Sequence, residues 1–120
     1  MPFPVINPGD VIRIEDRDAP PVKIKIHVCI CMGDQLFMRI NSKPIWLPCH
    51  MILRKNNQYL DHDSYVELNQ LVRHSHRELK EAEVVGRMSS SETKNLIAAA
   101  ERAETLTTEH KARIKLRLTY

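Results

Sequence analysis

The segment at residues 23–31, KIKIHVCIC, alternates between aliphatic side chains and polar or sulfur-containing ones. In an extended strand successive side chains point to opposite faces, so Lys25 and His27 fall on the face opposite the aliphatic residues. A second alternating run, LFMRIN at residues 36–41, follows after the short turn Met-Gly-Asp-Gln. The two runs predict a β-hairpin with one buried face and one outward face.

The two faces must agree across the turn, because directly opposed residues share a face. A two-residue loop at Gly33 and Asp34 would place Val28 opposite Arg39 and mix the faces. A three-residue loop, with Gly33 or a neighbour in a left-handed conformation, places apolar residues opposite one another instead. This register buries six apolar residues together: Ile24, Ile26, Val28, Ile30, Met38 and Ile40.

The same register gathers a polar patch on the outward face, formed by Lys25, His27, Arg39 and Asn41. Histidine is the residue type best suited to proton transfer near neutral pH, although a strand histidine is often only hydrogen-bonded to a neighbour. Arg39 requires either an external anion or a carboxylate from across the sheet, such as Glu15 or Glu67. We therefore expect function at this patch.

Shorter runs predict further strands at residues 11–15, 45–47, 51–53, 65–72 and 83–88, and a helical turn within residues 73–79. The period then changes to that of a helix at residues 90–104. Ser89 and Glu92 have the spacing of a capping box there, and Leu96, Ile97 and Ala100 form an apolar stripe.

The last segment, residues 108–118, is predicted as a helix capped by Thr108, with an added strand at residues 114–118 as the alternative.

The 120 residues, 42% of them hydrophobic, suit a single domain spanning residues 1–120. The N-terminus has neither a basic leader nor a long apolar run, and no segment reaches the roughly 20 apolar residues of a membrane span. We therefore expect a cytoplasmic protein with no membrane partner. Three cysteines, an odd number, fit a reducing compartment. Cys29, Cys31, Cys49 and His50 lack the spacing of a structural zinc site, so no metal and no cofactor are expected.

Positive charge is concentrated in two places. Residues 23–55 carry six lysines and arginines against one aspartate, and residues 107–120 carry four against one glutamate. A basic hairpin and a basic tail suit a polyanionic partner such as RNA or DNA. The alternative is a solvated strand face whose lysines serve solubility.

Several short motifs occur in a definite order. The run PGDV at residues 8–11 precedes the first strand, a cation opens the second strand, and small polar residues end the third. DSYV at residues 63–66, NQL at 69–71, VGRMS at 85–89 and a helix with three alanines at 98–100 follow. This series, over about residues 7–105, resembles the MazF/PemK family of bacterial toxins. It leaves residues 107–120 as a basic C-terminal extension.

The resemblance implies a mainly β fold with α, namely a small SH3-like β-barrel like that of MazF, PemK and CcdB, with a C-terminal amphipathic helix. It also implies a homodimer that cleaves single-stranded RNA without metal and is inhibited by a cognate antitoxin. Lys25 stands at the family's arginine, Asn41 or Ser42 at its threonine or serine, and Asn69 at an acidic position of some members. These departures replace a bidentate phosphate ligand by a point charge and remove a carboxylate.

Metal-free cleavage uses the RNA 2′-hydroxyl as nucleophile, and so needs a base, a cation at the phosphate and a donor for the leaving 5′-oxygen. The predicted catalytic residues are Lys25, His27, Arg39, Asn41 and Ser42. The predicted RNA-binding residues are Arg17, Lys43, Trp46, Asn69 and Gln70. The expected function is therefore an endoribonuclease toxin of a type II toxin-antitoxin system. The alternative is a non-catalytic relative that binds an antitoxin, RNA or another protein, as the related toxin CcdB acts on DNA gyrase.

Overall fold

A curved, mostly antiparallel sheet organises the chain in this computed structural model, which describes residues 4–16 and 23–120. Within those residues the sheet has seven strands, in the order β4-β5-β3-β2-β1-β7, with β6 paired to β3. The strands are β1 (Asp10–Asp16), β2 (Lys23–Cys31), β3 (Leu36–Asn41), β4 (Cys49–Ile52), β5 (Ser64–Glu67), β6 (Val72–Arg73) and β7 (Glu83–Arg87). The helices are the 3-10 turn η1 (Arg54–Asn56), α1 (His76–Lys80), α2 (Ser90–Arg102) and α3 (Thr108–Leu118). The mainly β fold with α is confirmed.

The hairpin of β2 and β3 has the predicted facing of residues. His27 lies opposite Arg39, and Val28 lies opposite Met38. A bulge in β2 lengthens the connection to residues 32–35, and Gln35 rather than Gly33 adopts the left-handed conformation, with φ of 56°. The extra residue of the bulge keeps the parity of the two strands, so the faces stay unmixed even though the loop is longer than predicted.

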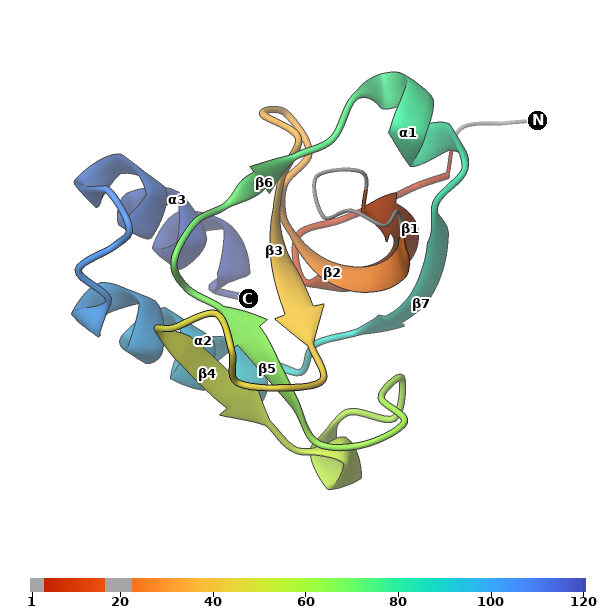
Figure 1. The fold of residues 1–120 in the computed structure, drawn as a ribbon. Helices are drawn as coiled ribbons and strands as arrows, with labels where there is room; N and C mark the ends of the chain where they lie inside the picture. Colours follow the sequence, from red (N-terminus) through yellow and green to blue (C-terminus); the bar gives the residue numbers. More distant parts are fainter. Residues whose placement is uncertain (1–3, 17–22) are drawn as a thin grey trace.

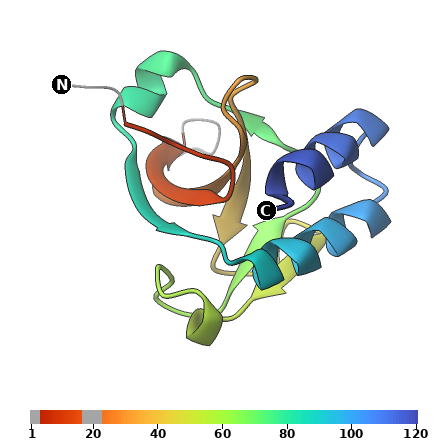
Figure 2. The ribbon, with the colours of Figure 1, turned by 180° about the vertical axis from the view of Figure 1, so that it is seen from behind.

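Two apolar cores lie on opposite faces of the hairpin. The main core combines Val28, Ile30, Met38 and Ile40 with residues of α2 and α3. Figure 2 shows these two helices side by side. The second core lies on the other face and contains Ile12, Ile14, Cys29, Phe37, Val72 and Leu79. Strand β2 curves strongly, so that α1 and β6 lie over this second face (Figure 1).

The prediction that the second face is outward is therefore wrong. His27 is 0% exposed, and Arg39 and Asn41 are also buried. Alternation tells which residues share a face, but whether a face is covered depends on distant segments such as α1 and β6. The prediction that Ile24 is buried is also wrong, because its side chain is 68% exposed. It lies beyond the end of β3 and pairs only with Glu15 of β1, so no core reaches it.

The remaining strands are partly as predicted. Strands β1, β4 and β7 are confirmed, although β4 begins at Cys49. Residues 45–47 form an exposed loop rather than a strand, because Pro44 and Pro48 flank them and proline cannot complete a ladder. The run at residues 65–72 divides into β5 and β6.

The predicted helices α2 and α3 are both present. Ser89 caps α2 by accepting a hydrogen bond from the Glu92 N–H, and Leu96 and Ala100 are buried as expected. A full capping box, with both hydrogen bonds, occurs at the start of α1 between Ser75 and Glu78. The cap of α3 is Thr107 rather than Thr108. None of the helices in the described ranges is long and apolar enough to cross a bilayer.

Helix α3 is part of the main core, with Ile114 and Leu118 fully buried. Its cations also have partners within the chain. Arg113 forms an ion pair with Asp34, and Lys115 approaches Glu101 at 3.8 Å. Deleting residues 107–120 would therefore disturb folding as well as any role of this basic segment in binding.

We predict that Leu118→Ala lowers the free energy of unfolding by about 2–5 kcal/mol, because it leaves a cavity in the main core. The matched control is Leu116→Ala, on the same helix, where the leucine is 69% exposed. Thermal or urea unfolding of the two variants measures the difference. Equal losses would contradict the assignment of α3 to the core.

Candidate nucleic-acid interface

A hydrogen-bonded polar network extends through the second face of the sheet from the interior to the surface. The Arg39 guanidinium pairs with Glu67, with Nη1 and Oε2 3.4 Å apart. The Asn41 Nδ2 donates to the other carboxylate oxygen of Glu67 at 3.2 Å, and the Lys25 Nζ donates to the Asn41 Oδ1 at 3.3 Å. Because β5 lies beside β3, Glu67 reaches both residues. The pairing of Arg39 with a carboxylate across the sheet, one of the two alternatives, is thus present.

His27 belongs to a second buried cluster. Its Nδ1 lies 2.8 Å from the Nε2 of His74, and the two rings stack with centroids 4.9 Å apart. Phe37 packs edge-on against His74, and the other ring nitrogen of His74 lies 3.8 Å from the Glu78 carboxylate. One imidazole must donate and the other accept across the 2.8 Å contact, so the two rings cannot both be fully protonated there. His27 is therefore hydrogen-bonded to a neighbouring side chain inside the fold, which was the structural alternative to a catalytic role.

A groove of about 580 Å³ opens where β2 begins and β3 ends. Five of the predicted site residues line it: Lys25, Asn41, Ser42, Lys43 and Trp46. His27 and Arg39 lie buried beneath the sheet surface instead, and Asn69 and Gln70 are not part of the groove lining. Arg17 lies outside the described residues. The structure therefore brings together five of the predicted site residues and separates four others, His27, Arg39, Asn69 and Gln70, from them.

The groove combines positive charge with exposed apolar surface. Among the described residues, four cations and one carboxylate line it: Arg13, Lys23, Lys25, Lys43 and Asp61. Trp46, the only tryptophan of the chain, is 52% exposed beside Ile45. Cations that follow a phosphate backbone, together with an aromatic ring on which bases stack, are the usual components of a single-strand binding surface.

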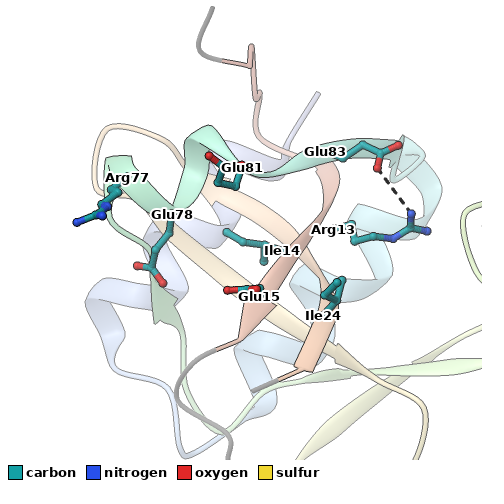
Figure 3. A pocket seen from close by; sticks show the side chains of 8 residues that line it. All are labelled: Arg13, Ile14, Glu15, Ile24, Arg77, Glu78, Glu81 and Glu83. Carbon is teal, nitrogen blue, oxygen red and sulfur yellow. Dashed lines mark ion pairs between the residues drawn. The ribbon is translucent and has the colours of Figure 1, made fainter. Parts of the chain in front are cut away.

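A larger pocket of about 850 Å³ lies between β1, α1 and β7, and it has the opposite character. Its lining holds four glutamates and two arginines: Glu15, Glu78, Glu81, Glu83, Arg13 and Arg77. Figure 3 shows these side chains and the ion pair between Arg13 and Glu83, which are 3.6 Å apart. An excess of carboxylates repels a polyanion, so the groove rather than this pocket is the candidate interface.

His62 also lines the groove, although it is not among the site residues predicted from the sequence. It belongs to the run Asp-His-Asp-Ser, which reads as a polar break between strands. In the fold this run leads into β5, beside the end of β3, and places Asp61, His62 and Ser64 in the groove lining. The local signal was a histidine among hydrogen-bonding residues directly before a strand, but only the pairing of β3 with β5 identifies its neighbours.

The cysteines have the properties of structural residues. Burial raises the pKa of the Cys29 thiol to about 12 and also raises that of Cys49. A thiol is nucleophilic only as thiolate, so Cys29 is unreactive near neutral pH. Within residues 4–16 and 23–120, no group of three or more histidine, cysteine, aspartate or glutamate side chains is arranged to hold a metal ion.

We predict that Arg39→Met destabilises the protein by about 3–5 kcal/mol, because it leaves the Glu67 carboxylate buried without its cation. The double variant Arg39→Met, Glu67→Leu should recover much of this loss. Arg13→Met provides a control, since its ion pair with Glu83 is exposed and is worth about 0–1 kcal/mol. Urea unfolding measures all three, and a loss for Arg39→Met no larger than for Arg13→Met would show that the buried pair is not structural.

A second prediction concerns pH and the capping box of α1. Hydrogen bonds from Ser75, that of its backbone N–H first, hold the pKa of Glu78 below its ordinary value. The folded state therefore favours the ionised carboxylate of Glu78. Its contribution to the free energy of unfolding is complete above the ordinary pKa of a glutamate, and it is lost as the pH falls through the lowered pKa of the folded state. Glu78→Ala should therefore cost about 0.5–2 kcal/mol at neutral pH, and less in acid.

The measurement is the unfolding free energy of wild type and Glu78→Ala between neutral pH and acid. Glu104→Ala, which removes an exposed glutamate, is the control and should track the wild type. A Glu78→Ala difference that is constant over this range would contradict a role for the ionised carboxylate.

No protein-family model matches the chain, and no curated protein matches it either. The MazF/PemK resemblance therefore stays a prediction from the order of short motifs. We therefore infer a function from the groove and from the side chains that line it.

Proposed function

We propose that the chain binds single-stranded RNA in the groove and cleaves it without metal, as the toxin of a type II toxin-antitoxin system. The observation that carries this proposal is the presence of four cations and an exposed tryptophan in one groove. Such a surface binds the phosphates and stacks the bases at the same time.

Lys25 is the residue of the groove best placed to act at the reacting phosphate. Its ammonium group is held by Asn41, which Glu67 orients in turn, so the cation is positioned before RNA binds. A preorganised cation stabilises the charge that develops on the phosphate when the 2′-hydroxyl attacks. Ser42, exposed at the end of β3, supplies a hydroxyl donor to the same phosphate. Lysine acts there as a point charge and not as the bidentate ligand that an arginine would provide.

The proposal includes an SH3-like barrel and a homodimer. The strong curvature of β2, with β7 paired to β1 and β6 paired to β3, supports the barrel (Figure 1). The exposed side chains of Met51, on the edge strand β4, and of Leu47, just before it, provide apolar surface for a second copy. An acidic antitoxin segment would compete with RNA for the cations of the groove.

One observation favours a second candidate, a non-catalytic barrel that binds RNA, an antitoxin or another protein. Three of the five predicted catalytic residues, His27, Arg39 and Asn41, are buried and hydrogen-bonded within the fold. A groove with phosphate-binding cations but no base would bind RNA without cleaving it. Binding and cleavage must therefore be tested separately.

For binding, we predict that Lys43→Ala weakens the affinity for a 2′-O-methyl RNA oligonucleotide. It should also reduce the slope of log K against log salt by about 0.7, the value for one phosphate contact on a single strand. Fluorescence anisotropy at several salt concentrations measures both effects. Lys94→Ala, on the exposed face of α2, is the matched control and should keep the wild-type slope. If Lys94→Ala reduces the slope as much as Lys43→Ala does, the RNA lies elsewhere.

For cleavage, we predict that the purified protein cuts mixed-sequence RNA in the presence of EDTA and leaves 2′,3′-cyclic phosphate ends. Lys25→Ala should lower the rate by about 10²–10³-fold, the usual effect of removing one preorganised group from the transition state. Gel analysis of end-labelled RNA follows the products, with Lys94→Ala as the control. RNA binding without cleavage by the wild type, at high protein concentration, would select the non-catalytic candidate.

A further inference from the structure

The loop that contains His62 is held in place at several points. The Arg54 N–H donates to the Asp63 carboxylate at 2.8 Å, and the Ser64 hydroxyl donates to the His62 carbonyl at 3.0 Å. Ser64 itself is buried at the start of β5, where it pairs with Ile52 of β4. His62 is exposed and lines the groove together with Lys25 and Ser42. The exposed side chain of His62 thus extends into the groove from a backbone that is held by hydrogen bonds.

The hydrogen bonds of His62 select one tautomer of its ring. The Nδ1 lies 3.0 Å from the Asp63 carbonyl oxygen, which can only accept a hydrogen bond. The Ser64 Oγ, 3.3 Å from the same nitrogen, already donates its proton to the His62 carbonyl, so it too acts as an acceptor. The Nδ1 must therefore carry the proton. In the neutral ring the Nε2 then holds the free electron pair, the form that a general base requires.

We propose that His62 is the general base of RNA cleavage in the groove, and that Ser64 is its positioning residue. This inference rests on the proposed function. The Nε2 of His62 takes the proton of the RNA 2′-hydroxyl while the 2′-oxygen forms a bond to phosphorus. The bond from phosphorus to the 5′-oxygen breaks, and that oxygen leaves with the electron pair and takes a proton from the Lys25 ammonium. The products are a 2′,3′-cyclic phosphate and a 5′-hydroxyl, and solvent exchange restores the starting protonation of both side chains.

The other histidines of the chain do not fit this role. His27 and His74 are buried against each other. His50 on β4, His76 on α1 and His110 on α3 are all outside the groove lining. The charged groups near His62 are Asp61, Asp63, Arg54, Lys25 and Lys43. The carboxylate of Asp63 accepts a hydrogen bond from the backbone N–H of Arg54 in η1. His62 is the only histidine among the described residues that line the groove, which it shares with the carboxylate of Asp61.

The test compares three variants in single-turnover cleavage with EDTA present. We expect His62→Ala to lower the rate by about 10²–10⁴-fold, the usual contribution of a general base. Its affinity for a 2′-O-methyl RNA, which cannot react, should be close to that of wild type. Ser64→Ala should lower the rate less and leave the affinity unchanged. His110→Ala, on α3, is the control for loss of a histidine and should cleave normally.

Two further measurements separate a base from a structural residue. Added imidazole should restore part of the cleavage rate of His62→Ala and none of that of Lys25→Ala. The acidic limb of the wild-type pH–rate profile should be absent from His62→Ala, because that limb reports protonation of the base.

Three results would overturn the assignment. Equal cleavage by wild type and His62→Ala would exclude His62 as the base while leaving the endoribonuclease proposal intact. A loss of RNA affinity in His62→Ala as large as the loss of rate would make His62 a binding residue. RNA binding by the wild type without any cleavage would reject both this inference and the endoribonuclease proposal.

Discussion

The ion pair between Arg39 and Glu67 is the interaction on which the rest of the site depends. Glu67 is only 2% exposed, and a carboxylate so deep in a protein is tolerated only when cations and hydrogen bonds compensate its lost hydration. Arg39 provides the charge, and Asn41 provides a further hydrogen bond. Because Asn41 also holds the Lys25 ammonium, the buried pair fixes a cation at the surface of the groove. The stability of the fold and the proposed RNA recognition thus depend on one connected set of side chains.

The sequence was sufficient to predict the elements whose signals are local. Strict alternation predicted which residues of β2 and β3 share a face, and the structure pairs His27 with Arg39 and Val28 with Met38 in agreement with it. Helical periodicity and a capping serine predicted α2. These features depend on backbone geometry within one segment or one hairpin, which neighbouring residues determine.

The environment of the hairpin's second face could not be predicted in the same way. That face is covered by α1 and β6. The first residue of β6, Val72, is more than 30 residues after the end of β3 at Asn41. His74 approaches His27 only because β6 pairs with β3. For the same reason the alternation of apolar residues could not identify His62, whose position in the groove depends on the pairing of β5 with β3. Alternation assigns residues to faces, and tertiary contacts decide which face meets the solvent.

The polar residues of the hairpin fall into a buried set, which includes His27 and Arg39, and a set that lines the groove, which includes Lys23 and Lys25. One strand, β2, thus contributes both to a core and to the groove. The inner half of β2 is buried on both faces, whereas its first two residues, Lys23 and Ile24, are exposed and Lys25 and Ile26 are half-buried. The loop at residues 42–47 contains Pro44 and is followed by Pro48, and these prolines keep it out of the sheet. Lys43 and Trp46 of this loop complete the groove.

The most direct test of the central claim, that RNA binds in this groove, is the fluorescence of Trp46 during titration with a 2′-O-methyl RNA oligonucleotide. The chain has one tryptophan, so its emission reports on the groove alone. If RNA binds in the groove, the fluorescence of Trp46 should be quenched saturably and should follow the binding curve measured by anisotropy, because bases stack on the indole ring. Tight RNA binding with unchanged emission of Trp46 would contradict it.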